Sequence, residues 1–265
     1  MAQSAYTRSE AELQITPISA FQDNYIWLLE RDNHGVVVDP GDAQAVLRTL
    51  AQGPIKLDAI LLTHHHPDHV GGVAELVAVC APKVYGPANS PFKAIDVRLR
   101  EGDRAQVLGE ELSVLEVPGH TLDHIAYWCP AQEALFCGDT LFACGCGRLF
   151  EGSAAQMLAS LNKIARMPEK TRVYCAHEYT AANIRFALAV EPHNAQLLAR
   201  AQACATARSR REPTVPSTLA LEKATNPFLR CAQTTVREAV ATRRGTALED
   251  DIAVFAALRS WKDVY

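Results

Sequence analysis

The feature that most constrains this chain is a cluster of potential metal ligands directly after an apolar run, residues 59–62 (Ala-Ile-Leu-Leu). Four candidates follow that run: His64, His66, Asp68 and His69. The run predicts a buried strand, and the loop after a strand presents side chains to solvent from a rigid base. Side chains two apart in an extended segment point the same way, so His64 and His66 are expected to bind one ion together. Asp68 and His69 lie where a helix is predicted to begin, which suits a second ion nearby.

Three further predicted strands each lead into one more candidate ligand: His120, Asp139 and His177. Glycines directly before His120 and Asp139 suit sharp loops at these positions. A single histidine near a strand end is more often structural than functional. Three such residues beside the first cluster together indicate a binuclear metal site.

The candidates divide into two sets of three, with one residue shared between them. The first set is His64, His66 and His120. The second set is Asp68, His69 and His177. Asp139 is left to bridge the two ions, because a carboxylate has two oxygens. His65 is expected to point away from the ions, and His124 is either a hydrogen-bonding residue behind the ligands or a polar residue that starts the next strand.

Two divalent ions about 3.5–4 Å apart lower the pKa of a bridging water towards neutrality, which predicts a hydrolytic nucleophile at pH 7. In that arrangement Asp68 and Asp139 are the candidate catalytic carboxylates, since they hold the nucleophile through the ions. Imidazole and carboxylate ligands accept zinc, iron or manganese, and zinc is the first expectation.

Composition excludes several classes of protein. The 265 residues are 48% hydrophobic, enough for a packed core, and the formal charge of −4 gives no reason to expect a nucleic-acid or membrane partner. No run reaches the length of a transmembrane helix, and the polar N-terminus has no signal-peptide core. Eight scattered cysteines in a chain of this length favour a reduced, cytoplasmic protein. A monomer that binds a small molecule is expected.

The pattern of elements changes after His177. Up to that point, short apolar strands alternate with turns and helices, whereas residues 180–190, 194–210 and 249–262 show helical spacing. The sequence therefore predicts a metal-binding catalytic domain over 1–177 and an α-helical domain over 178–265. Residues 1–14 are expected to be a ragged extension. Residues 178–265 carry 12 basic and 9 acidic side chains, a net +3, which hints at an anionic ligand near this part.

The ligand pattern resembles that of the metallo-β-lactamase superfamily. The resemblance implies an α/β (α+β) fold, specifically an αββα sandwich, here with a C-terminal helical domain. From about Ile15 onward the chain looks like the glyoxalase II, or hydroxyacylglutathione hydrolase, family. The distinguishing motifs are residues 140–148, 177–180, 212–217, 226–228 and Arg259-x-x-Lys262.

This resemblance implies a thioester hydrolase that cleaves S-D-lactoylglutathione, and other 2-hydroxyacylglutathiones, to the hydroxy acid and glutathione, the second step of methylglyoxal detoxification. It also implies a glutathione site completed by the helical domain. The positions that match the family's contacts are Arg148, Tyr179, Arg259 and Lys262. Arg259 and Lys262 are three apart on a predicted helix and therefore share a face. Some members carry lysine in place of Arg148 and tyrosine in place of Phe150.

Three alternatives stay open on the sequence. One is another hydrolase on the same site, such as a lactonase or an RNA-processing nuclease; a nuclease needs a basic channel, and residues 1–177 are net −7. Another is a mononuclear iron persulfide dioxygenase, although one iron needs fewer ligands than this chain supplies. The last is a binding module without catalysis, which a complete ligand set argues against.

Overall fold

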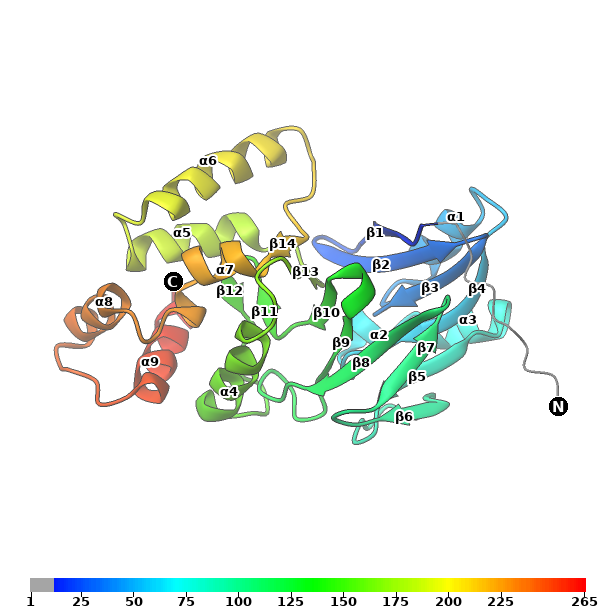
Figure 1. Ribbon diagram of the computed structural model, residues 1–265, viewed down its shortest axis with the longest axis horizontal. Helices are drawn as coiled ribbons and strands as arrows, with labels where there is room; N and C mark the ends of the chain where they lie inside the picture. The colour runs from blue at the N-terminus through cyan, green and yellow to red at the C-terminus, as the bar shows by residue number, and fades with distance from the viewer. Residues whose placement is uncertain (1–11) are drawn as a thin grey trace.

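Two β-sheets stack face to face between layers of helices in the computed structural model, which describes residues 12–265 (Figure 1). The first sheet has the order β1-β2-β3-β4-β5-β6: β1 (Gln14–Ala20), β2 (Asn24–Arg31), β3 (His34–Val38), β4 (Lys56–Leu61), β5 (Lys83–Pro87) and β6 (Val97–Leu99). The second has the order β14-β13-β10-β9-β8-β7: β14 (Ser217–Thr218), β13 (Arg172–Cys175), β10 (Ala134–Gly138), β9 (Ile125–Cys129), β8 (Glu110–Glu116) and β7 (Arg104–Val107). β11 (Leu141–Phe142) and β12 (Gly145–Cys146) form a separate hairpin.

Alternation along the strands explains this layering. On β2, Trp27 and Leu29 belong to the core between the sheets, whereas Ile26 and Leu28 belong to a second core beneath α1 and α3. Successive side chains of a strand point to opposite faces, so a strand that is apolar at every position needs a partner layer on both sides.

Helices flank the sandwich and also form a separate group at one end, at left in Figure 1. Those within residues 43–165 are α1 (Ala43–Leu50), α2 (Pro67–Val70), α3 (Val73–Cys80), the 3-10 turn η1 (Pro130–Gln132) and α4 (Ala154–Ala165). The group at the end comprises α5 (Thr180–Val190), α6 (Ala195–Ser209), α7 (Leu219–Thr225), η2 (Pro227–Leu229), α8 (Thr234–Arg244) and α9 (Asp251–Asp263). None of the helices within residues 12–265 is both long and apolar enough to span a bilayer.

The αββα sandwich with a helical C-terminal part is as the sequence predicts, and two local details differ. The segment 212–217, expected to be irregular, leads into β14, where Ser217 pairs with Val173 at the edge of the second sheet. Helices α7 and α8 were not predicted individually, because α7 is short and α8 carries few apolar residues. Of the expected N-terminal extension, residues 1–11 lie outside the described part, while Leu13 is buried in the core.

Candidate metal centre

Strand ends deliver all the predicted ligands to one edge of the sandwich. The loop after β4 carries His64 and His66, and the single-turn helix α2 follows with Asp68 and His69. From the second sheet, His120 follows β8, Asp139 follows β10 and His177 follows β13. The two facing sheets thus bring together residues that are up to 113 positions apart in sequence.

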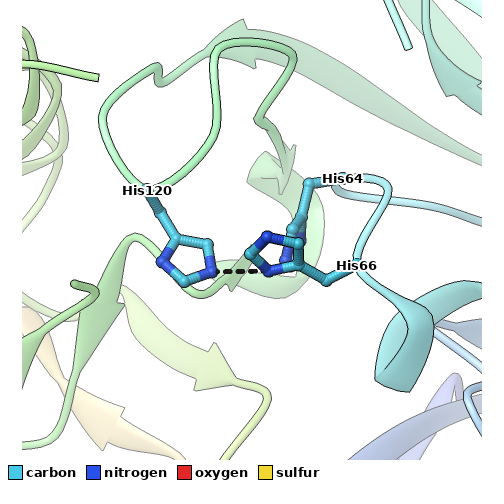
Figure 2. Close-up of side chains that lie close together, drawn as sticks. All are labelled: His64, His66 and His120. Atoms are coloured by element: carbon cyan, nitrogen blue, oxygen red, sulfur yellow. Dashed lines mark hydrogen bonds between the residues drawn. The ribbon is translucent and has the colours of Figure 1, made fainter. Parts of the chain in front are cut away.

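Three histidines form the first cluster, shown in Figure 2. One nitrogen each from His64, His66 and His120 lies within 4.8 Å of the others. The closest pair is Nε2 of His120 and Nδ1 of His66, at 3.0 Å, marked by the dashed line. Three converging imidazoles match a catalytic divalent site, in which three protein ligands leave a further coordination position open.

Asp68, His69 and His177 form the second cluster, whose ligand atoms also lie within 4.8 Å of one another. Oδ2 of Asp68 is 3.5 Å from Nε2 of His69 and 3.5 Å from Nε2 of His177. Asn24 donates to the same carboxylate oxygen at 3.0 Å, which holds the Asp68 side chain in place.

The carboxylate of Asp139 lies between the two clusters. Its Oδ2 is 3.4 Å from Nε2 of His120, while its Oδ1 is 3.5 Å from Nε2 of His69 and 3.4 Å from Nε2 of His177. One oxygen therefore faces each cluster, the arrangement a bridging ligand requires. The structure thus brings together all seven predicted ligands in the expected grouping.

Carboxylates lie on the far side of two of the imidazoles and orient the rings. Nδ1 of His177 is 2.9 Å from Asp23, and Nδ1 of His69 is 3.1 Å from Asp39. Such partners fix which nitrogen is protonated and leave the other free for a metal. Neither aspartate was expected from the sequence to have a role, although Asp39 directly follows the strand β3 just as Asp139 directly follows β10.

Buried polar atoms without partners test whether these residues fit divalent ions. Nε2 of His64, Nε2 of His69 and Oδ1 of Asp139 are all buried and make no hydrogen bond within the described chain. Burying such groups without a partner is costly, so a set of them around one point indicates a ligand. Metal ligands must also be deprotonated. Burial lowers the pKa of His64 well below its usual range, whereas the neighbouring carboxylates outweigh burial and raise the pKa values of His69 and His177. Burial opposes ionisation of Asp139, but His69 and His177 outweigh it and hold the pKa of its carboxyl well below the usual range.

Two neighbouring histidines lie outside the ligand set. His65 points away, as expected: its Nδ1 is 2.9 Å from Asp123 and its Nε2 is 3.3 Å from Glu151. His124 is buried and accepts a hydrogen bond at Nε2 from the backbone N–H of Asp139 at 3.1 Å. Of the two roles left open for His124, the structure therefore shows the hydrogen-bonding one.

A cleft of about 580 Å³ opens over both clusters. Among its lining residues are all four positions expected to contact glutathione: Arg148, Tyr179, Arg259 and Lys262. Asn183 also lines this cleft, although no sequence pattern singles it out.

The four side chains differ in how firmly they are held. Tyr179 stacks on the ring of His177, with centroids 4.6 Å apart. Arg259 is 4% exposed, donates to the carbonyl of Cys146 at 3.0 Å and pairs with Asp263 at 2.9 Å. The Arg148 side chain is largely exposed, with its Nε 3.9 Å from the same Asp263 carboxylate. Burial, with Arg259 adding to it, lowers the pKa of Lys262 to about 8.

Comparison with known proteins divides the chain into two matches. Residues 21–177 match the family model described as "Metallo-beta-lactamase superfamily", and residues 178–265 match "Hydroxyacylglutathione hydrolase C-terminus". A hydroxyacylglutathione hydrolase of Albidiferax ferrireducens is 51% identical over 96% of this chain and all of the relative. One of Dechloromonas aromatica is 52% identical over 96% of this chain and all of the relative.

Solved structures also share this fold. A crystal structure of TTHA1623 in a di-iron-bound form is 29% identical, with a TM-score of 0.58 over 82% of this chain and all of that one. A crystal structure of ETHE1 from Myxococcus xanthus reaches a TM-score of 0.64 over 96% of this chain and 99% of that one, at 22% identity.

Proposed function

The chain belongs to the hydroxyacylglutathione hydrolase family within the metallo-β-lactamase superfamily, and we propose that it hydrolyses S-D-lactoylglutathione to D-lactate and glutathione. One observation carries this proposal: a single cleft joins two clusters of potential metal ligands to cationic side chains of α9. A thioester carbonyl can then reach the clusters while the carboxylates of glutathione meet Arg259 and Lys262.

We propose that one ion is held by the first cluster (His64, His66, His120), a second by Asp68, His69 and His177, and that Asp139 is shared. When bound, two such ions supply an activated water for attack on the thioester and positive charge for the oxyanion. Zinc is the proposed occupant, and the ligand types also accept iron or manganese.

The chain's own residues orient the reactants and hold protons in place. Asp23 hydrogen-bonds to the outer nitrogen of His177, and Asp39 lies 3.1 Å from the outer nitrogen of His69, so the inner nitrogens of both rings face Asp139. Oriented ligands of this kind need no rearrangement during the reaction. The leaving group is a thiolate, and because a thiol pKa is about 8.5, no strong general acid is needed.

Substrate binding is assigned to the four cleft residues Arg148, Tyr179, Arg259 and Lys262. Glutathione carries two carboxylates, and guanidinium and ammonium groups recognise these by charge-assisted hydrogen bonds. The exposed Phe150 ring packs against the ring of His66, with the two ring centroids 5.4 Å apart, and it has no hydroxyl to donate. It therefore shapes the cleft by contact alone.

We also propose a division at residues 177 and 178, a monomer in solution and a cytoplasmic location. The two family matches meet at this boundary. All eight cysteines are free thiols, which suits a reducing compartment. Measuring the molar mass of the purified protein in solution tests the monomer, and a dimer would contradict it.

The first experiment is hydrolysis of S-D-lactoylglutathione, with metal content determined on the same sample. We expect rapid turnover with close to two ions per chain. The variant His66→Ala should lose an ion and nearly all turnover, whereas His193→Ala, which changes a histidine outside both clusters, should match the parent. Absence of turnover in a fully metallated sample would refute the substrate while leaving the fold unaffected.

A further inference from the structure

Side chains from the C-terminal helices hold the hairpin formed by β11 and β12 (residues 141–146) at nearly every peptide. Glu222 accepts a hydrogen bond from the backbone N–H of Cys144 at 2.9 Å. Asn226 donates to the carbonyls of Phe142 and Gly145 at 3.1 and 2.9 Å. Asn183 donates to the carbonyl of Ala143 at 3.0 Å. The hairpin backbone is thus bound to α5, to α7 and to the residue that follows α7, and the side chain of Cys144 adds a contact to Thr225 of α7 at 3.6 Å.

Glu222 is the centre of this arrangement. Its side chain is fully buried and accepts four hydrogen bonds, two at each oxygen. Arg200 and Ser217 each donate to Oε1 at 2.5 Å, while Cys144 and Asn226 donate to Oε2 at 2.9 and 3.0 Å. A buried carboxylate is tolerated only when it is paired and fully hydrogen-bonded, and this one satisfies both conditions.

The bound hairpin lies between two parts of the candidate site. It begins two residues after Asp139 and ends two residues before Arg148. Its base is closed by a hydrogen bond from the N–H of Gly147 to the carbonyl of Thr140 at 3.2 Å. Phe142 and Cys146 of the hairpin line the cleft.

The tip of the hairpin adopts a conformation that needs external support. Cys144 has a φ of +56°, in the left-handed region that L side chains rarely adopt. Such a residue persists only where its surroundings fix it. The contact from its N–H to Glu222 supplies that constraint, together with the two carbonyls bound by Asn226.

We propose that Glu222 is a positioning residue that acts through this hairpin to keep Asp139, at its start, in register with the glutathione-binding wall of the cleft, at its end. Glu222 does not line the cleft, and its hydrogen-bond partners among the described residues are not candidate metal ligands. The inference rests on the proposed function for its choice of substrate, and it makes the helical segment part of the scaffold of the metal centre.

The principal variant is Glu222→Gln, which keeps the shape but removes one acceptor oxygen and the charge opposite Arg200. On samples of equal metal content, KM for S-D-lactoylglutathione should rise roughly tenfold or more, with a smaller change in kcat. Glu222→Asp should recover part of the loss. Loss of folded protein alone would lower kcat per total protein and leave KM unchanged.

A second variant tests the same inference if Glu222→Gln does not fold. Asn226→Ala removes two contacts to the hairpin and one to Glu222 but leaves the ion pair between Arg200 and Glu222 in place, so it should also raise KM. One control should match the parent: Glu169→Gln, which changes an exposed partner of Lys223.

Hydrogen exchange measured by mass spectrometry supplies a readout that needs no substrate. In both Glu222→Gln and Asn226→Ala, exchange should accelerate in peptides covering 141–147 and stay unchanged in peptides from β2 and β3. If the parent chain hydrolyses no glutathione thioester, the proposed function fails, and the exchange comparison still decides the role of Glu222. Parental exchange over 141–147 in both variants, with parental KM, overturns the inference.

Discussion

At the scale of single residues, what matters is which nitrogen of each histidine faces the centre. Asp39 accepts hydrogen bonds from the N–H and hydroxyl of Thr63, both at 2.7 Å, and it also lies 3.1 Å from Nδ1 of His69. One carboxylate thus fixes the loop that starts the ligand motif and the ring of its last histidine. The spacing of histidines predicts a metal site, but it does not reveal the acceptors that orient them.

Lys262 provides a pH prediction at the same scale. Its pKa is lowered to about 8, so the ammonium loses its charge at a lower pH than an ordinary lysine does. On the proposed assignment the charged form binds the substrate's carboxylate, and we therefore expect KM to rise as pH increases from about 7 to 9. KM is to be measured across this range with the spontaneous hydrolysis rate subtracted.

Two variants isolate the lysine in that measurement. Lys262→Arg keeps its charge throughout the range and should give a nearly flat KM profile. Lys262→Gln should be flat too, but with a high KM. A parental slope that persists in both variants would assign the titration to another group.

At the scale of elements, sequence periodicity predicted the longer helices and the buried strands well. The expected helix over 180–190 coincides with α5, and the strand expected at residues 59–62 overlaps β4. β14 was not predicted, because a strand of two residues shows no alternation of apolar and polar side chains. It forms because β13, which contains Val173, offers a free edge for pairing. Elements stabilised by their surroundings cannot be read from their own residues.

The loop that closes the hairpin provides a prediction at this scale. A Cβ on Gly147 would lie 2.0 Å from the carbonyl oxygen of Asp139 and 3.0 Å from Nδ1 of His120. Because both neighbours belong to the candidate site, Gly147→Ala should displace them and lower zinc affinity by roughly 10-fold or more. Zinc affinity is measured by competition with a chromogenic chelator.

Gly53→Ala is the matched control for that measurement, since a Cβ there meets only Ile55 at ordinary contact distances. It should bind zinc as the parent does. Equal zinc affinity in the Gly147 and Gly53 variants would show that the loop can shift without disturbing the ligands.

At the scale of the whole molecule, the ligands join loops from both sheets, so bound ions would connect the two halves of the sandwich. Any ligand that binds only the native state stabilises it by mass action. Removing the ions with a strong chelator should therefore lower Tm by roughly 5–10 °C, and adding zinc back should restore it. Thermal unfolding followed by circular dichroism measures both.

The variant His66→Ala is the control for that experiment, because a chain with an incomplete first cluster binds fewer ions and gains less stability from them. Its Tm should respond less to the chelator than the parental Tm does. Identical melting of the parent with and without chelator, at verified metal loss, would mean that the ions do not contribute to folding stability.

By itself, the sequence determined the identity of the candidate ligands, and the family resemblance of its motifs implied the sandwich that presents them. The ligands follow from a local pattern, namely polar residues directly after apolar strands such as β4 and β10. The tertiary structure alone decided how the ligands meet, which aspartates orient them, and that a buried carboxylate on α7 holds the hairpin beside Asp139. These depend on contacts between residues far apart in the chain. Glu222 and Cys144, 78 positions apart, become neighbours only once the helical segment has packed.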